Sequence, residues 1–316
     1  MSEFIIAVDL GGTQIRAARY DTELNMLERA AQPTLAHHGI DVVVDRLLET
    51  IEQVSPEDRD SILGLGISAP GPINPHTGTI FSPPNLPGWE KVPLRDIIQE
   101  RLGCKTYLGN DANVAALAEA TRGAAQGYKY IIYLTVSTGI GSGIIDDGHL
   151  VIGTEGLGAE AGHMMMVVNG RIVDLEEEAA GPAIARKTIA RLEAGTSSII
   201  PDMVNGQLEN VTAQIVGEAA EAGDALAIEV IQEAGKFVGL GIVTLMHLFN
   251  PQIFVVGGGV SKTGDLLFDP MRATVQEYTL DKAYWADIPI VPAALGDNVA
   301  LVGAAALVAT RGGRSV

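Results

Sequence analysis

Cysteine, aromatic residues and positive charge are all scarce in this chain of 316 residues. Its single cysteine, Cys104, permits no disulfide within the chain and no cysteine cage for a metal, and it suits a reducing compartment such as the cytoplasm. The 21 Lys and Arg residues are outnumbered by 39 Asp and Glu residues, and they form no cluster along the sequence. A formal net charge of −18 repels nucleic acid and anionic lipid, so we expect neither as a partner.

Long apolar runs are missing as well. The most apolar stretch with helical character, Phe237–Phe249, is too short to span a membrane and carries His247. Near the N-terminus, Glu3 stands where an export signal would have basic residues, and Asp9 interrupts the first apolar run. We therefore expect a protein with neither an export signal nor a membrane anchor.

The sequence does contain strand-like apolar runs that alternate with amphipathic helical segments, a pattern that predicts an α/β fold. At 316 residues the chain is longer than one hydrophobic core usually supports, so two packed lobes are expected. The expected strands are Phe4–Val8, Ile62–Ile67, Tyr130–Val136, Ile144–Ile145, His163–Val168, Ile253–Val256 and Ile288–Val291. The expected helices are Val42–Val54, Leu94–Leu102, Ala112–Arg122, Gly181–Glu193, Ala225–Phe249 and Val299–Ala309.

The first of three glycine clusters follows the first expected strand, in the sequence DLGGT (9–13). It has the spacing of neither a dinucleotide-binding motif nor a P-loop. Gly11 and Gly12 instead indicate a hairpin turn, whose backbone N–H groups can surround a phosphate. Asp9 would then hold a hydrated Mg²⁺ ion beside that phosphate. For this pentapeptide alone, a plain hairpin capped by Asp9 is an equally good interpretation.

The other two clusters favour a bound nucleotide. Thr138 and Gly139 belong to STGIGSGI (137–144), which again offers hydroxyl and amide donors after a strand. Two facing turns of this kind suit a nucleoside triphosphate. The third cluster, Gly257–Gly259, would let an adenosine approach the backbone closely, although a flexible loop is the more ordinary interpretation of these glycines alone.

Asp111 lies between a strand-like segment, Lys105–Leu108, and the helix expected from Ala112. As a helix N-cap it would stabilise that helix by about 1 kcal/mol. As a general base it would accept the proton of a hydroxyl group that attacks a phosphoryl group. The two roles can coexist.

Taken together, these motifs resemble those of the ROK family of sugar kinases and sugar-responsive repressors, within the actin-like, ribonuclease-H-like ATPases. The resemblance covers nearly the whole chain. Three segments resemble the two phosphate motifs and the adenosine motif: VDLGGTQIRAA (8–18), STGIGSGI (137–144) and VVGGGVS (255–261). Three more resemble the sugar-site motifs: NDANVAALAEA (110–120), GAEAGH (158–163) and LEEEAAGPAI (175–184). The implied fold has two lobes of mixed sheets flanked by helices, residues 1–112 plus 298–316 and residues 113–297.

The resemblance also implies roles for single residues, with Asp111 as the general base. The residues implied to contact the sugar are Gly71, Asn85, Asn110, Asp111, Glu160, His163 and Glu176. Those implied to contact ATP are Asp9, Gly11, Gly12, Thr13, Gln14, Thr138, Gly139, Gly257, Gly258 and Gly259, with Asp9 holding Mg²⁺ through water. Without the family match, Asn85 would be an ordinary turn residue, and Glu160 with His163 an ordinary polar pair.

One motif departs from the family pattern. Many members carry a zinc motif, Cys-x-Cys-Gly-x-x-Gly-Cys, after the site histidine. Here the segment HMMMVVNGRIVDLE (163–176) has no cysteine, and Asp174 stands where the last cysteine would be. We therefore expect no structural zinc, which frees His163 for the sugar. The sequence leaves open what orders the turn at Asn169–Asp174.

The function implied is an ATP-dependent hexose kinase, glucokinase foremost, that uses Mg²⁺ and transfers the γ-phosphoryl group to the sugar 6-hydroxyl. The family is commonly dimeric, so a cytoplasmic homodimer is expected. Fructose, mannose, N-acetylglucosamine or N-acetylmannosamine could replace glucose, and polyphosphate could replace ATP. A DNA-binding repressor is disfavoured because the first phosphate motif starts within the first few residues. An actin-like assembly protein would need no sugar site, and a non-catalytic sugar- or nucleotide-binding protein is the remaining alternative.

Overall fold

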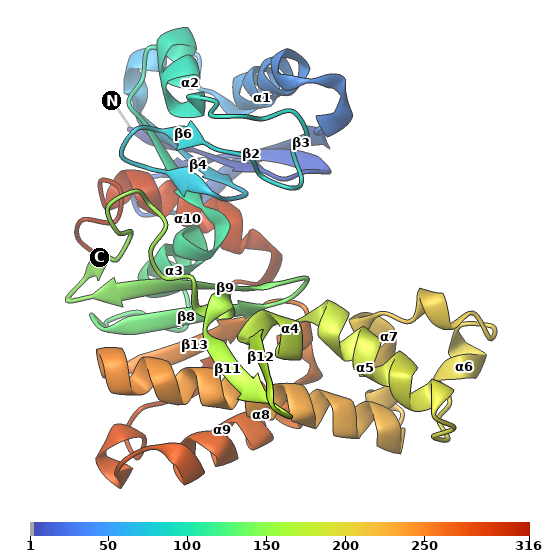
Figure 1. The fold of residues 1–316 in the computed structure, drawn as a ribbon. Helices are drawn as coiled ribbons and strands as arrows, with labels where there is room; N and C mark the ends of the chain where they lie inside the picture. Colours follow the sequence, from blue (N-terminus) through green and yellow to red (C-terminus); the bar gives the residue numbers. More distant parts are fainter. Residues whose placement is uncertain (1–2) are drawn as a thin grey trace. The chain divides into compact units, whose positions relative to one another are not determined.

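A computed structural model describes residues 3–316, which form two compact units (Figure 1). The first unit contains the described residues up to Ile131, together with Gly143–Ala159 and Ala294–Val316. The second contains Ile132–Ser142 and Glu160–Ala293. These bounds differ from the division at 112/113 and 297/298 expected above, because the helix that follows Asn110 packs within the first unit.

The first unit is built on a five-stranded sheet with the strand order β3-β2-β1-β4-β7. Its antiparallel part consists of β1 (Phe4–Leu10), β2 (Gln14–Asp21) and β3 (Met26–Pro33). The other two strands, β4 (Ile62–Ala69) and β7 (Thr106–Asn110), run parallel to β1. Parallel strands end at the same edge of a sheet, so the loops after β1, β4 and β7 meet there.

Four helices pack in the first unit: α1 (Ile40–Val54), α2 (Leu94–Leu102), α3 (Asp111–Arg122) and α10 (Val299–Ala309). A short hairpin, β5 (Ile73–Asn74) and β6 (Thr79–Ile80), lies between β4 and α2 in sequence. The last helix, α10, contacts β1, β4 and α3. These contacts are so close that a Cβ atom on Gly66 would lie 1.8 Å from the Ala304 carbonyl oxygen, and one on Gly303 would lie 2.0 Å from that of Val114. The core of the first unit therefore depends on the last helix of the chain.

A buried glutamate, Glu119, links α3 to the segment that precedes α10. Its side chain is fully buried, and its carboxylate accepts hydrogen bonds from the amides of Ala124 (2.7 Å), Ala294 (3.0 Å) and Leu295 (3.1 Å). These charge-assisted bonds satisfy a carboxylate that would otherwise be costly to bury.

The second five-stranded sheet has the order β10-β9-β8-β13-β14. Its strands are β8 (Ile131–Val136), β9 (Ile140–Asp146), β10 (His149–Leu150), β13 (Ile253–Gly257) and β14 (Ile290–Pro292). The helices of the second unit are α4 (Leu175–Ala179), α5 (Gly181–Glu193), α6 (Ile200–Met203), α7 (Ala213–Glu221), α8 (Ala225–Phe249) and α9 (Asp265–Tyr278). Figure 1 shows α8 and α9 side by side, in agreement with their close contacts.

A separate hairpin, β11 (Met165–Val168) and β12 (Arg171–Asp174), occupies the segment that departs from the family zinc motif. Its turn residues Asn169 and Gly170 have φ angles of 50° and 77°. Asn-Gly is the preferred pair where both central residues of a two-residue hairpin turn need positive φ. The hairpin leads directly into α4, which carries Glu176.

The α/β class expected from the sequence is confirmed, with two mixed sheets flanked by helices. Each expected helix matches an observed one closely. The expected strand at His163–Val168 begins only at Met165, because Ala161–His163 forms a short 3-10 helix. No helix within residues 3–316 combines the length and apolar character needed to cross a membrane.

Candidate functional site

The first glycine turn joins β1 to β2, as predicted from Gly11 and Gly12. The Gly11 amide donates to the Gln14 carbonyl at 3.0 Å, and the Thr34 hydroxyl donates to the Gly11 carbonyl at 2.6 Å. A Cβ atom on Gly12 would lie 2.8 Å from the Cβ and carbonyl oxygen of Asn85. Glycine is therefore required at position 12, and Asn85, an expected sugar ligand, lies against the expected phosphate turn.

Asp9 lies at the end of β1 and is paired with Arg16, directly opposite on β2. Its Oδ2 accepts hydrogen bonds from Arg16 Nε at 2.8 Å and Nη2 at 2.5 Å. Burial raises the pKa of Asp9, and Arg16 offsets part of that rise. Arg16 also donates from Nη1 to the Asp297 carbonyl at 2.9 Å. Arg16 was not among the expected site residues. The hairpin predicted at DLGGT was the feature that could have placed it opposite Asp9.

Asn110 and Asp111 lie where β7 ends and α3 begins, and a Cβ atom on Gly71 would be 3.8 Å from that of Asn110. Asn110, rather than Asp111, is the N-cap of α3, because its Oδ1 accepts a hydrogen bond from the Asn113 amide at 2.8 Å. The capping interpretation of Asp111 was therefore wrong by one residue. The structural task falls on Asn110, which leaves Asp111 as the first residue of the helix.

The carboxylate of Asp111 has unusual electrostatics. Although the residue keeps an exposed surface, partial removal of water from its carboxylate raises its pKa. A hydrogen bond from the Ala112 amide (2.8 Å) lowers the pKa, and the negative charge of Asp9 raises it further. No basic side chain contributes to this shift. Asp111 is thus a carboxylate without a neutralising cation, a suitable state for accepting a proton.

The second glycine turn, between β8 and β9, contacts another expected sugar ligand. Oε2 of Glu176 accepts a hydrogen bond from the Ile140 amide at 2.7 Å. A Cβ atom on Gly139 would lie 2.5 Å from that same oxygen. Because Gly139 has no side chain, the turn has room for the Glu176 carboxylate. That carboxylate already accepts the Ile140 amide of the turn.

His163 ends the short 3-10 helix and is surrounded by carboxylates. Its Nδ1 lies 3.1 Å from Oδ2 of Asp174, whose Oδ1 caps α4 by accepting from the Glu177 amide at 2.8 Å. The hydrogen bond to Asp174 is the main cause of a raised His163 pKa, and the charges of Glu176 and Glu160 add to it. Burial alone would raise the pKa of Asp174, but these hydrogen bonds outweigh it and lower the pKa. Glu160, His163 and Glu176 thus gather in the second unit, together with Asp174, which the expected site did not include.

A cavity of about 720 Å³ in the second unit brings two expected nucleotide motifs together, because Thr138 and Gly259 both line it. Gly258, the residue before Gly259, has a φ of 90°, and a Cβ atom there would lie 2.3 Å from the Val136 carbonyl oxygen. Gly257 is the last residue of β13. The cavity is also lined by Val211–Gln214. Sequence reasoning missed these residues because the helix α7 was not predicted.

The expected site residues thus form groups within each unit. The first unit holds Asp9, Gly11–Gln14, Gly71, Asn85, Asn110 and Asp111, and the second holds Thr138, Gly139, Glu160, His163, Glu176 and Gly257–Gly259. The first unit thus contains the Asp111 carboxylate and one glycine turn, and the second contains another glycine turn and a mainly apolar cavity of about 720 Å³, a size typical of small-molecule sites.

Comparison with known proteins supplies an independent line of argument. The sequence model of the ROK family matches residues 5–311. The glucokinase of Thermotoga maritima is 33% identical to the chain over 313 residues, which cover 97% of this chain and 98% of that enzyme.

Two solved structures are similar in both fold and sequence. A ROK family glucokinase from Streptomyces griseus in complex with glucose and AMPPNP has a TM-score of 0.78 and 31% identity, with 96% of this chain and 98% of that one covered. A ROK hexokinase from Thermus thermophilus has a TM-score of 0.78 and 32% identity, with 96% and 97% covered.

Proposed function

The chain belongs to the ROK family, and we propose that it is an ATP-dependent glucokinase that transfers the γ-phosphoryl group of ATP to the 6-hydroxyl of glucose. The observation that carries this proposal is the end of β7. There Asp111 has a raised pKa and, among residues 3–316, no basic side chain that lowers it, and it follows the helix cap Asn110, which lies near Gly71. This is the position expected for a base that activates a sugar hydroxyl.

In the proposed reaction, the Asp111 carboxylate accepts the proton of the 6-hydroxyl as that oxygen bonds to the γ-phosphorus. The bond between the γ-phosphorus and the bridging oxygen breaks, and ADP leaves with the electron pair. No covalent enzyme intermediate forms. Most of the rate would come from alignment of the hydroxyl with the phosphoryl group and from stabilisation of the developing charge by the glycine turns.

Asp9 suits a role in holding Mg²⁺. Both hydrogen bonds from Arg16 go to its Oδ2, and the negative charge of nearby Asp111 offsets part of the positive charge of Arg16. Mg²⁺ binds through one or two carboxylates and water when phosphates supply the other oxygens, and such an ion would neutralise phosphate charge. Gly11–Gln14 and Thr138–Gly139 would donate to the phosphates, and Gly257–Gly259 would lie beside the adenosine.

The residues proposed to contact the sugar in the first unit are Gly71, Asn85, Asn110 and Asp111. Glu160, His163 and Glu176 would bind hydroxyls from the second. His163 and Glu176 are each fixed by a partner, Asp174 and the Ile140 amide respectively. Fixed donors and acceptors distinguish the orientations of sugar hydroxyls. We also propose that the enzyme is a cytoplasmic homodimer, which light scattering would test.

The direct test is an ADP-release assay with ATP and Mg²⁺ against glucose, fructose, mannose, N-acetylglucosamine, N-acetylmannosamine and no sugar. Turnover that is fastest on glucose and abolished by EDTA is the expected result. Faster turnover on another sugar would keep the mechanism and change the substrate. Turnover with polyphosphate but not with ATP would identify polyphosphate as the phosphoryl donor. The absence of turnover with every sugar and donor would overturn the kinase proposal.

A further inference from the structure

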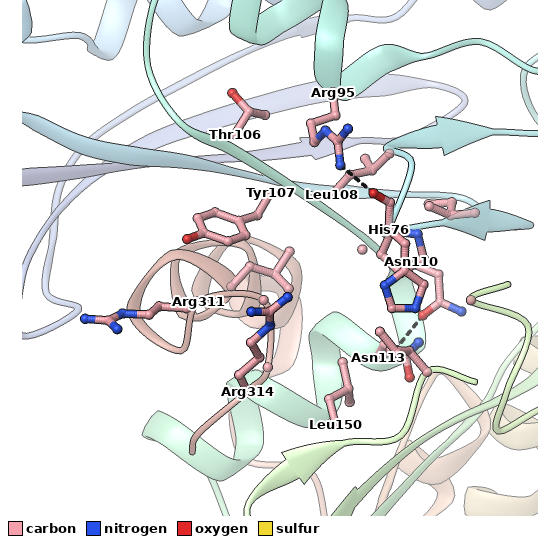
Figure 2. A pocket seen from close by; sticks show the side chains of 18 of the residues that line it. His76, Arg95, Thr106, Tyr107, Leu108, Asn110, Asn113, Leu150, Arg311 and Arg314 are labelled. Atoms are coloured by element: carbon pink, nitrogen blue, oxygen red, sulfur yellow. Dashed lines mark hydrogen bonds between the residues drawn. The ribbon is translucent and has the colours of Figure 1, made fainter. Parts of the chain in front are cut away.

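A groove follows the outer edge of β7, within the first unit (Figure 2). β7 is the last strand of its sheet, and among residues 3–316 it pairs with β4 alone. The backbone carbonyl of Lys105 accepts a hydrogen bond from the Leu65 amide of β4 at 2.8 Å. Because successive residues of a strand face opposite sides, the amides of Thr106 and Leu108 point away from β4. The Thr106 amide is taken by Gln99 Oε1 at 3.1 Å. One wall of the groove is therefore a strand edge that has no neighbouring strand among residues 3–316, and the groove has a volume of about 650 Å³.

The groove is basic in a strongly acidic protein. Its lining includes Arg95, Lys105, Arg311 and Arg314 but no Asp or Glu, against a net charge of −18 for the whole chain. Arg95 forms a salt bridge with the neighbouring Asp96, and its Nη1 donates a hydrogen bond to the His76 carbonyl at 2.9 Å. Concentrated positive charge without a carboxylate in the lining attracts an anion.

One rim of the groove combines a cation with an aromatic ring. Lys105 Nζ lies 5.1 Å from the centroid of the Tyr107 ring. Lys105 and Arg314 form no ion pair among residues 3–316, so their charges remain available to a ligand. Arginine and lysine at such a rim bind phosphate oxygens readily.

The lining also contains a buried acceptor that lacks a donor within residues 3–316. Asn113 is only 4% exposed, and its Oδ1 has no hydrogen-bond partner in the described part of the chain. Its backbone amide is already used, because it donates to Asn110 Oδ1 (Figure 2). Buried polar atoms without partners are rare in native proteins, and each indicates a missing partner. A ligand hydroxyl would supply the donor, while Leu150 and Leu307 provide apolar walls.

We propose that this groove binds a phosphorylated, hydroxyl-bearing small molecule of the sugar-phosphate class. The phosphate lies at Lys105 and Arg314, and a hydroxyl donates to Asn113. The volume is in the range of small-molecule sites. The proposal does not rest on the kinase assignment. It does bear on the candidate site, because Asn110 lines the groove and also caps the helix that begins at Asp111.

Calorimetric titration of the full chain with glucose 6-phosphate, inorganic phosphate and glucose tests the proposal. The charge reversals Lys105→Glu and Arg314→Glu should each weaken glucose 6-phosphate binding at least tenfold. The matched control is Arg101→Glu, which makes the same change on an exposed residue of α2 outside the groove and should stay within twofold of the natural chain. Asn113→Ala should weaken glucose 6-phosphate binding but leave inorganic phosphate binding unchanged.

Three outcomes would overturn the proposal. One is the absence of saturable binding of glucose 6-phosphate to the folded chain. Another is equal binding by Arg314→Glu, Lys105→Glu and the control, with folding of each variant verified by its thermal unfolding. The third is complete displacement of glucose 6-phosphate by glucose, which would place that ligand at the candidate sugar site instead.

Discussion

Nδ1 of His163 lies 3.1 Å from Oδ2 of Asp174, so the residues at the two ends of the β11–β12 hairpin are joined directly. The other oxygen of Asp174 caps α4, which carries Glu176. One carboxylate thus connects two candidate sugar ligands. The hairpin has no cysteine, and the hydrogen bonds of Asp174 connect its two ends and the start of α4.

Replacement of Asp174 by Asn should lower the pKa of His163, because the hydrogen bond to the carboxylate is the main cause of its rise. NMR titration of the His163 ring would measure the change, with Asp202→Asn as a control that removes an exposed carboxylate elsewhere in the second unit. Because the pKa of His163 is higher in the folded chain than its ordinary value of 6.5, protonation of this ring stabilises the fold. The stabilisation is complete below pH 6.5 and is lost as the pH rises through the folded-state pKa. The variant should lose that pH dependence. An unchanged His163 titration would contradict the assigned contact.

Replacement of Asp111 by Asn should lower kcat by roughly 10²–10⁴-fold without unfolding the protein, because the base is lost while the helix cap remains. Replacement of Asn110 by Ala should instead lower the free energy of unfolding by about 1 kcal/mol, since it removes the cap. Steady-state kinetics and thermal unfolding of both variants separate the two effects. Near-normal turnover of Asp111→Asn would refute the base assignment.

A methyl group at Gly139 should displace the Glu176 carboxylate, because its Cβ would lie 2.5 Å from Oε2. We expect Gly139→Ala to raise the KM for the sugar at least tenfold. Ser197→Ala is the control, since it changes an exposed residue of the second unit outside the cavity and the candidate site. If the KM of Gly139→Ala equals that of the control, Glu176 does not bind the sugar.

Removal of the buried Glu119 carboxylate should destabilise the first unit. Glu119→Ala leaves the amides of Ala124, Ala294 and Leu295 without their acceptor, a loss of about 3 kcal/mol. Glu100→Ala, an exposed residue on α2, should change stability by no more than about 0.5 kcal/mol. Urea unfolding of both variants measures the difference, and equal midpoints would show that these bonds contribute nothing net.

Much of the fold could be predicted because its signals are local. The Gly11–Gly12 hairpin and helices such as α1 and α8 follow directly from residue type and period. Helix α9 was missed because Pro270 lies inside it, beyond the first turn, where proline normally breaks a helix. β3 was missed because it is largely exposed and lacks an apolar run.

The candidate site was predictable only where a motif marks it. Arg16 and Asp174 were not predicted as site residues, because each contacts a site residue that strand pairing brings near it. No local sequence pattern reveals such a contact. The groove beside β7 escaped for a stronger reason. Its basic residues come from α2, β7 and the segment after α10, so no stretch of sequence shows the cluster.

The packing of α10 has a consequence for synthesis on the ribosome. Gly66 of β4 and Val114 of α3 are covered by a helix that begins only at Val299. The first hundred residues therefore emerge long before the helix that completes their core. The nascent chain must wait for nearly all of its sequence before this unit can close, and during that interval its apolar sheet is exposed to chaperones and to aggregation.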